Sequence, residues 1–99
     1  MYVAMNRFKV VSDREVEFEG VWKERARAID DVPGFLELKI LRPETGTKEY
    51  ISMSLWESKD AFVGWTKSDA FARAHSKSRS GLLEGHPNFE GFEVFETSD

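Results

Sequence analysis

Two hydrophobic periods alternate along this chain, and their order limits the possible folds more than any other feature of the sequence. A period of two, which is typical of a half-buried β-strand, marks four segments, near residues 2–11, 35–42, 47–57 and 89–96. Between the first and second segments, and again between the third and fourth, apolar residues recur every three or four positions, as on an amphipathic helix. The sequence therefore predicts the order strand, helix, strand, strand, helix, strand.

Short polar motifs set the expected ends of the first helix. Ser12 and Glu15 have the spacing of a capping box, in which each side chain bonds the backbone amide of the other residue. This motif predicts a helix that follows Ser12 and runs to about Asp31, where Pro33 and Gly34 end it.

Similar signals divide the second half of the chain. Residues 43–46, Pro-Glu-Thr-Gly, predict a turn that joins the second and third strands into a hairpin. Ser58 is expected to cap a helix that runs to about Arg79. The pair Ser68-Asp69 is a second start signal, so we expect this helix to be broken there.

The predicted order is that of the ferredoxin-like α+β fold, βαββαβ, in which helices cover one face of a four-stranded antiparallel sheet. The 99 residues are expected to form one domain, 1–99. The other sheet face carries large apolar side chains and needs a cover. Depending on the register, its candidates are Met5, Phe35, Leu41, Tyr50, Trp56, Phe89 and Phe95. We therefore expect a second copy of the chain to cover this face.

Composition excludes several classes of partner. The net charge is −4 and no basic run is present, which argues against a nucleic-acid partner. The chain has no cysteine, so disulfides, thiolate metal sites and cysteine nucleophiles are excluded. No apolar run approaches the length of a membrane span, and no signal peptide is visible. We therefore expect a cytoplasmic protein with no membrane partner.

Two polar residues break the apolar pattern of their elements. Asn6 shares a strand face with Ala4 and Phe8, where an amide needs hydrogen-bond partners. Its side chain is either satisfied locally or kept for a ligand. Arg25 falls within the apolar stripe of the first helix. Its guanidinium either reaches solvent past its neighbours or pairs with an anion.

Trp65 and His75 each have a structural and a functional interpretation. A tryptophan near a helix end usually packs in the core. A single histidine on an apolar helix face is usually a hydrogen-bonded core residue, although a neutral imidazole could also bind a haem iron. Spacing alone leaves both interpretations open.

The segment from Phe62 to His75 resembles the F-x-x-W-x-x-S-x-x-F-x-x-A-H motif of the small haem-degrading monooxygenases, which belong to the antibiotic biosynthesis monooxygenase superfamily. The stretches 55–62 (Leu-Trp-Glu-Ser-Lys-Asp-Ala-Phe) and 32–35 (Val-Pro-Gly-Phe) are similar to that superfamily as a whole. The combination of Asn6, Trp65 and His75 is the part specific to haem degradation. The resemblance covers nearly the whole chain and implies a dimeric β-barrel.

The resemblance also implies a role for each site residue. His75 would be the proximal ligand of the haem iron, and Asn6 would hydrogen-bond a ligand on the distal side. Trp65 would press on the porphyrin and distort it, Phe71 of the same motif would line the site, and Arg25 would contribute to the distal region. Haem would be both cofactor and substrate, cleaved with O2 and electrons from an unidentified donor, so that iron is released.

Three other functions fit the same residues. The chain could be a cofactor-independent monooxygenase that acts on a polyketide-like aromatic, with a structural His75. It could be a non-catalytic haem-binding protein, or a ferredoxin-like dimer that binds a regulatory ligand. Replacement of His75 separates the haem-binding interpretations from the rest, because only these predict a loss of haem affinity.

Overall fold

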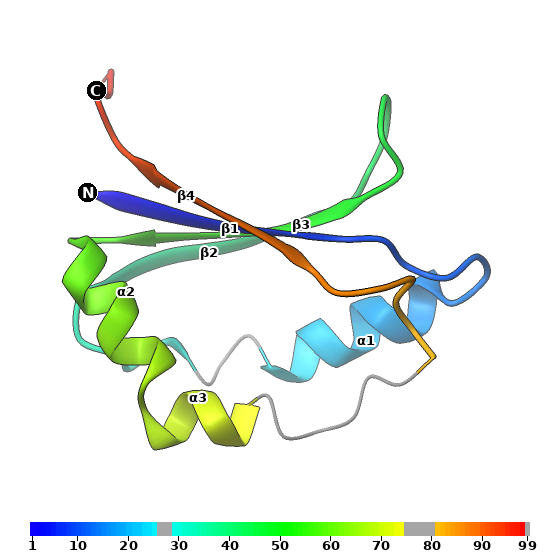
Figure 1. The fold of residues 1–99 in the computed structure, drawn as a ribbon, viewed down its shortest axis with the longest axis horizontal. Coiled ribbons are helices and arrows are strands. Elements are labelled where there is room, and N and C mark those ends of the chain that lie inside the picture. Colours follow the sequence, from blue (N-terminus) through cyan, green and yellow to red (C-terminus); the bar gives the residue numbers. More distant parts are fainter. Residues whose placement is uncertain (26–28, 75–80, 99) are drawn as a thin grey trace.

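The computed structural model describes residues 1–25, 29–74 and 81–98 and has two layers, a sheet and a set of helices. The elements are β1 (Tyr2–Phe8), α1 (Glu15–Arg25), β2 (Phe35–Leu41), β3 (Tyr50–Trp56), α2 (Lys59–Thr66), α3 (Asp69–Ala74) and β4 (Asn88–Glu93). The strands form one antiparallel sheet in the order β2-β3-β1-β4. All three labelled helices lie on the same side of it (Figure 1). This arrangement confirms the expected ferredoxin-like order.

The two serine signals in the second half of the chain are confirmed. Ser58 caps α2, and its hydroxyl accepts a hydrogen bond of 3.1 Å from the backbone amide of Ala61. The expected break falls between α2 and α3. There the Ser68 hydroxyl donates to the carbonyl of Trp65 at 2.7 Å and accepts from the amide of Phe71 at 3.1 Å. One side chain thus ends one helix and begins the next.

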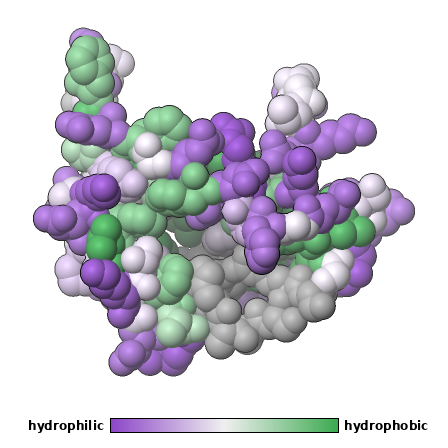
Figure 2. Space-filling model, in the orientation of Figure 1, coloured by the Kyte–Doolittle hydropathy of each residue, from purple (hydrophilic) through white to green (hydrophobic). Residues whose placement is uncertain are grey.

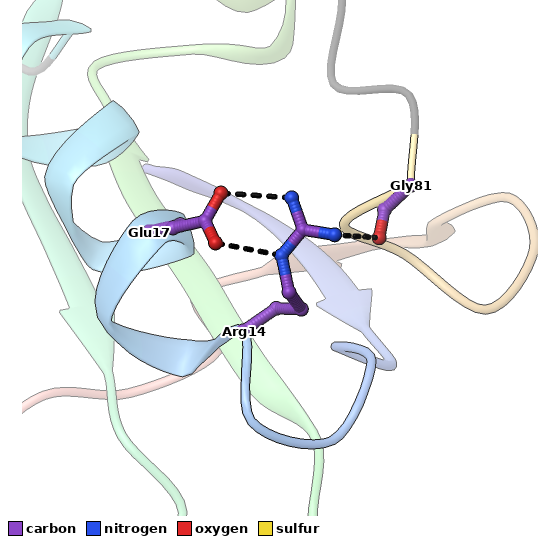
Figure 3. Close-up of polar contacts among 3 residues, drawn as sticks. All are labelled: Arg14, Glu17 and Gly81. Carbon is purple, nitrogen blue, oxygen red and sulfur yellow. Dashed lines mark hydrogen bonds and ion pairs between the residues drawn. The ribbon is translucent and has the colours of Figure 1, made fainter.

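The capping box at Ser12 is wrong. Helix α1 begins at Glu15, later than expected, and is described as far as Arg25; residues 26–28 of the expected helix lie outside the described residues. Asp13 has a φ of 70°, a left-handed conformation that turns the chain before the helix. Arg14 makes the contacts at this end: its guanidinium donates to Glu17 at 2.7 and 2.8 Å and to the carbonyl of Gly81 at 3.4 Å (Figure 3).

The register corrects the residues expected on the uncovered sheet face. Tyr50 and Trp56 are 4% and 0% exposed and lie on the helix side, as does Phe35, the partner of Trp56. Phe89 pairs with Asn6 and shares its face. The uncovered face instead carries aliphatic residues and methionines together with one phenylalanine of β4. Its apolar members are Val3, Met5, Leu41, Ile51, Met53, Leu55 and Phe92.

The core consists of two separate clusters. Phe8, Phe18 and Tyr50 form one, against α1. Ile29, Trp56 and Trp65 form the other, against α2 and α3. Because the clusters lie at opposite ends of the inner strands, the middle of the helix-side sheet face belongs to neither.

Among the described residues, no helix is long and apolar enough to cross a membrane.

Candidate functional site

Small and polar residues separate the two core clusters on the helix side of the sheet. The pairing places Asn6 between Phe89 of β4 and Ser52 of β3, and Ala4 between Gly91 and Ser54. We call Ala4, Asn6, Ser52, Ser54 and Gly91 the central strip. The side chains of the strip are short, whereas aromatic residues occupy the same sheet face at both of its ends.

The Asn6 amide has the environment of a ligand-binding group. Asn6 lies on the face of β1 where Ala4 and Phe8 are 2% and 3% exposed, so its side chain points toward the helical layer. The described part of the chain gives this amide no hydrogen-bond partner. The first of the two interpretations of Asn6, local satisfaction, therefore finds no support among the described residues.

A phenol also overhangs the strip. A β-carbon added to Gly91 would overlap the hydroxyl of Tyr2 and would lie 2.8 Å from Cζ of the same ring. The ring of Tyr2 packs on Phe62 of α2 at 5.6 Å between centroids. The phenol of Tyr2 can therefore pack over β4 at position 91 because glycine has no side chain there.

Aromatic rings line the sides of the strip. Phe62 stacks on Phe89 with a centroid separation of 5.6 Å and an interplanar angle of 6°. Trp65, 7% exposed, makes an edge contact with Phe71 at 5.4 Å. Figure 2 shows the surface hollowed near the middle of this view, between the sheet and the helical layer. Such surroundings suit a flat apolar ligand.

The expected site residues are located to different degrees. Trp65 and Phe71 lie together in one core cluster, and Asn6 lies in the central strip outside that cluster. Arg25 is the last residue of α1, and its side chain lies outside the described part. His75 follows Ala74, the end of α3, and itself lies outside the described residues. The structure thus places three of these five residues with their side chains.

Ser52 and Phe89 were missed as site residues, although both flank Asn6. Phe89 was expected on the uncovered face. The sequence contained no signal for Ser52, because the apolar residues Ile51 and Met53 defined the other face of the third strand. Only the register with β1 brings these residues together.

An ion-paired cluster fixes α1 to the sheet next to this site. The Arg42 guanidinium donates to both carboxylate oxygens of Glu19 at 2.8 and 2.6 Å, and the Tyr50 hydroxyl donates to Glu19 at 2.5 Å. The hydrogen bonds from Arg42 and then from Tyr50 lower the pKa of Glu19 from 4.5 to about 2. Burial raises the pKa of the Tyr50 phenol, and the Glu19 carboxylate adds to that effect.

Two open cavities lie away from Asn6 and the central strip. An open cavity of about 520 Å³ lies between residues 31–33 and helices α2 and α3, with Trp65 in its wall. Another of about 670 Å³ lies beside Arg42 and Tyr50. Asn6 lines neither of them. Across 1–25, 29–74 and 81–98, no three acidic or histidine side chains gather to hold a metal ion.

Comparison with known proteins gives a consistent set of relatives. Residues 1–77 match the model of the antibiotic biosynthesis monooxygenase family. The chain is 34% identical over 92 residues to the mycobilin-producing haem oxygenase of Mycobacterium tuberculosis, which covers 93% of this chain and 87% of the relative. A structure of the haem degrader MhuD of M. tuberculosis, with two haems bound in its active site, matches with a TM-score of 0.87 at 29% identity over 100% of both chains. The cofactor-independent oxygenase SnoaB of Streptomyces nogalater matches with a TM-score of 0.78 at 25% identity, over 97% of this chain and 94% of SnoaB.

Proposed function

This chain belongs to the antibiotic biosynthesis monooxygenase family, and on that premise we propose that it is a haem-degrading monooxygenase. Haem is both its cofactor and its substrate. The observation that carries the proposal is the split core, because it leaves an unpartnered Asn6 amide among small residues between two aromatic clusters. The relatives named as haem oxygenase and haem degrader support the same activity.

The residues of the central strip fit a porphyrin. Asn6 and Ser52 have short side chains at the middle of the strip, so a planar ring would be able to approach the sheet there. The apolar walls at Phe62 and Phe89 would bury the ring faces. Asn6 supplies a hydrogen-bonding group in an otherwise apolar space. An entirely filled, single core would have excluded such a ligand.

Each site residue has one task in this proposal. Bound haem would supply the iron that activates O2, and the porphyrin ring of the same haem would be the substrate that is oxidised. His75 would hold the haem iron through a neutral ring nitrogen, and the Asn6 amide would donate a hydrogen bond to an oxygen species bound at the haem. Trp65, held by its edge contact with Phe71, would press on the bound ring. Arg25 assists the polar side of the site. Electrons come from an external donor.

The proposed active form is a homodimer in the cytoplasm. The uncovered face of the sheet carries apolar residues along its inner strands, and a second copy would bury them (Figure 1). Two such faces packed together would form a β-barrel at the interface. Nucleic acid and membrane partners have no part in the proposal.

A cofactor-independent oxygenase is the second candidate. The likeness to SnoaB, and the fit of the same apolar space to a polycyclic aromatic, favour it. In that case Asn6 would bind a substrate oxygen, and the chain would have no affinity for haem. Haem binding therefore separates the two candidates.

The test is an absorbance time course on purified protein loaded with one equivalent of haemin. Ascorbate is added in air, with catalase present to remove free peroxide. We expect the haem bands to decay, a linear tetrapyrrole to appear and iron to become chelatable. His75→Ala should abolish stoichiometric binding, whereas His86→Ala, at the exposed second histidine of the chain, should bind and degrade haem normally.

Asn6→Ala gives the second comparison. It should bind haem but degrade it at least 10-fold more slowly, because one positioned donor is worth ~10-fold or more in rate. Asn88→Ala, on an exposed β4 position, is its matched control. Haem that binds and survives reductant and air would make the protein a haem carrier. No haem binding at all would favour the aromatic-substrate oxygenase.

A further inference from the structure

Strand β3 carries two buried serines that differ in what their hydroxyls do. Ser54, 9% exposed, accepts a hydrogen bond of 2.9 Å from the indole of Trp56 and donates to the carbonyl of Ala4 at 3.5 Å. Ser52, 6% exposed, has no hydrogen-bond partner within the part of the chain that the structure describes. Ser54 therefore belongs to the scaffold, and the Ser52 hydroxyl is left without a structural task.

The position of Ser52 suggests what that task is. Ser52 is the direct cross-strand partner of Asn6, on the same face of the sheet. Directly paired side chains have β-carbons only about 4.5–5.5 Å apart. Two adjacent polar groups therefore lie at the centre of a row whose outer members are apolar, Phe89 and Ile40.

Ser52 and Asn6 make no hydrogen bond to each other. Both side chains are short and extend from neighbouring β-carbons, so a single water molecule can link their polar groups. Such a water has two protein partners already, and it lies in a strip where the remaining neighbours are small or apolar.

We propose that Ser52 is a positioning residue of the haem site, and that it orients the Asn6 amide through a water molecule held between the two side chains. The water donates to the amide oxygen of Asn6. The amide nitrogen then faces the cavity as a donor. The orientation of the Asn6 amide, with its nitrogen toward the cavity, rests on the proposed function, because an oxygen species bound to haem iron accepts hydrogen bonds. The water-mediated contact between Ser52 and Asn6 does not depend on that function.

The composition of the chain makes the contact directly observable without haem. Asn6 and Asn88 are its two asparagines, and it has no glutamine. The side-chain amide region of a ¹⁵N spectrum of the haem-free protein therefore contains two NH2 pairs. Asn88, exposed on β4, serves as the internal reference.

In this spectrum, Ser52→Ala should move the NH2 signals of Asn6 toward the chemical shifts of the Asn88 NH2 signals. The exchange of the Asn6 NH2 protons with water should become about 3- to 10-fold faster, as expected for one lost hydrogen bond. Ser52→Thr, which keeps the hydroxyl, should restore both properties. Ser54→Ala should leave the Asn6 pair in place. An Asn6 pair that does not respond to Ser52→Ala, or that responds equally to Ser54→Ala, would overturn the proposal.

Haem-loaded protein gives the second readout. In the ferrous carbon monoxide complex, Ser52→Ala should shift the C–O stretching frequency toward the value of Asn6→Ala, and kcat should fall about 3- to 10-fold while the haem Kd changes less than about 2-fold. Equal loss of kcat and affinity would contradict a positioning role. If no variant binds haem, the proposed function fails, and the amide spectrum still decides the contact between Ser52 and Asn6.

Discussion

At the scale of single residues, Gly91 and Tyr2 constrain each other, because the phenol occupies the space of a side chain at position 91. Gly91→Ala should therefore force the Tyr2 ring away from Phe62 and lower the free energy of unfolding by about 1–2 kcal/mol. In a Tyr2→Ala background the same substitution should cost little. Urea denaturation of the four proteins measures this coupling. Additive effects of the two substitutions would show that Tyr2 does not fill this space.

Sequence reasoning found residues that break a pattern and missed those that agree with it. Asn6 was recognised because an amide is unusual between Ala4 and Phe8 on a strand face. Ser52 and Gly91 fit many environments, and only their register beside β1 gives them a role. Arg25 was recognised in the same way, because it falls within an apolar helix stripe, whereas the choice between the two interpretations of His75 came from the resemblance. Their roles stay predictions because both side chains lie outside the described part.

At the scale of elements, the attachment of α1 to the end of β2 depends on Glu19. The pKa of this carboxyl is lowered from 4.5 to about 2, first by the hydrogen bonds from Arg42 and then by that from Tyr50. A carboxyl with a lowered pKa stabilises the fold fully above its ordinary pKa. Its contribution should be lost as the pH falls from about 4.5 toward about 2.

Glu19→Gln tests this pH dependence. It should reduce stability by about 1 kcal/mol at pH 7 and flatten the acid side of a plot of the unfolding midpoint against pH. Glu44→Gln, in the loop between β2 and β3, removes a carboxylate that has no hydrogen bond or ion pair among the described residues and serves as control. A Glu19 variant with the acid profile of the unmodified protein would show that the cluster does not couple to folding.

The order and type of the elements could be predicted because each depends on local periodicity and caps. Ser58 and Ser68 act through neighbouring backbone atoms, so their motifs were sufficient. The start of α1 was not predictable in this way, because Asp13 adopts a left-handed turn and Arg14 contacts a segment distant in sequence, Gly81. The β2 register was also missed, since an irregularity between Phe35 and Glu37 shifts the alternation.

At the scale of the whole molecule, the proposed homodimer depends on the uncovered sheet face. Met53 lies on this face, on an inner strand, opposite Met5 of β1 and Lys39 of β2. The loop between β2 and β3 and the segment after β4 both bend toward this side (Figure 1). They flank the face without covering it, so a flat second surface can lie between them.

A charge placed at the centre of this face should separate the dimer. Met53→Glu would bury a carboxylate at the proposed interface, where its neighbour Lys39 already pairs with Glu37 at 3.0 Å. Burial of such a charge costs several kcal/mol, so we expect the variant to elute as a monomer and the unmodified protein as a dimer. Val16→Glu is the matched control, because Val16 on α1 is 86% exposed and a charge there stays in water. Light scattering coupled to gel filtration measures both. A dimeric Met53→Glu together with a monomeric Val16→Glu would place the interface on the helical layer instead, and haem would then have to enter the site through that interface.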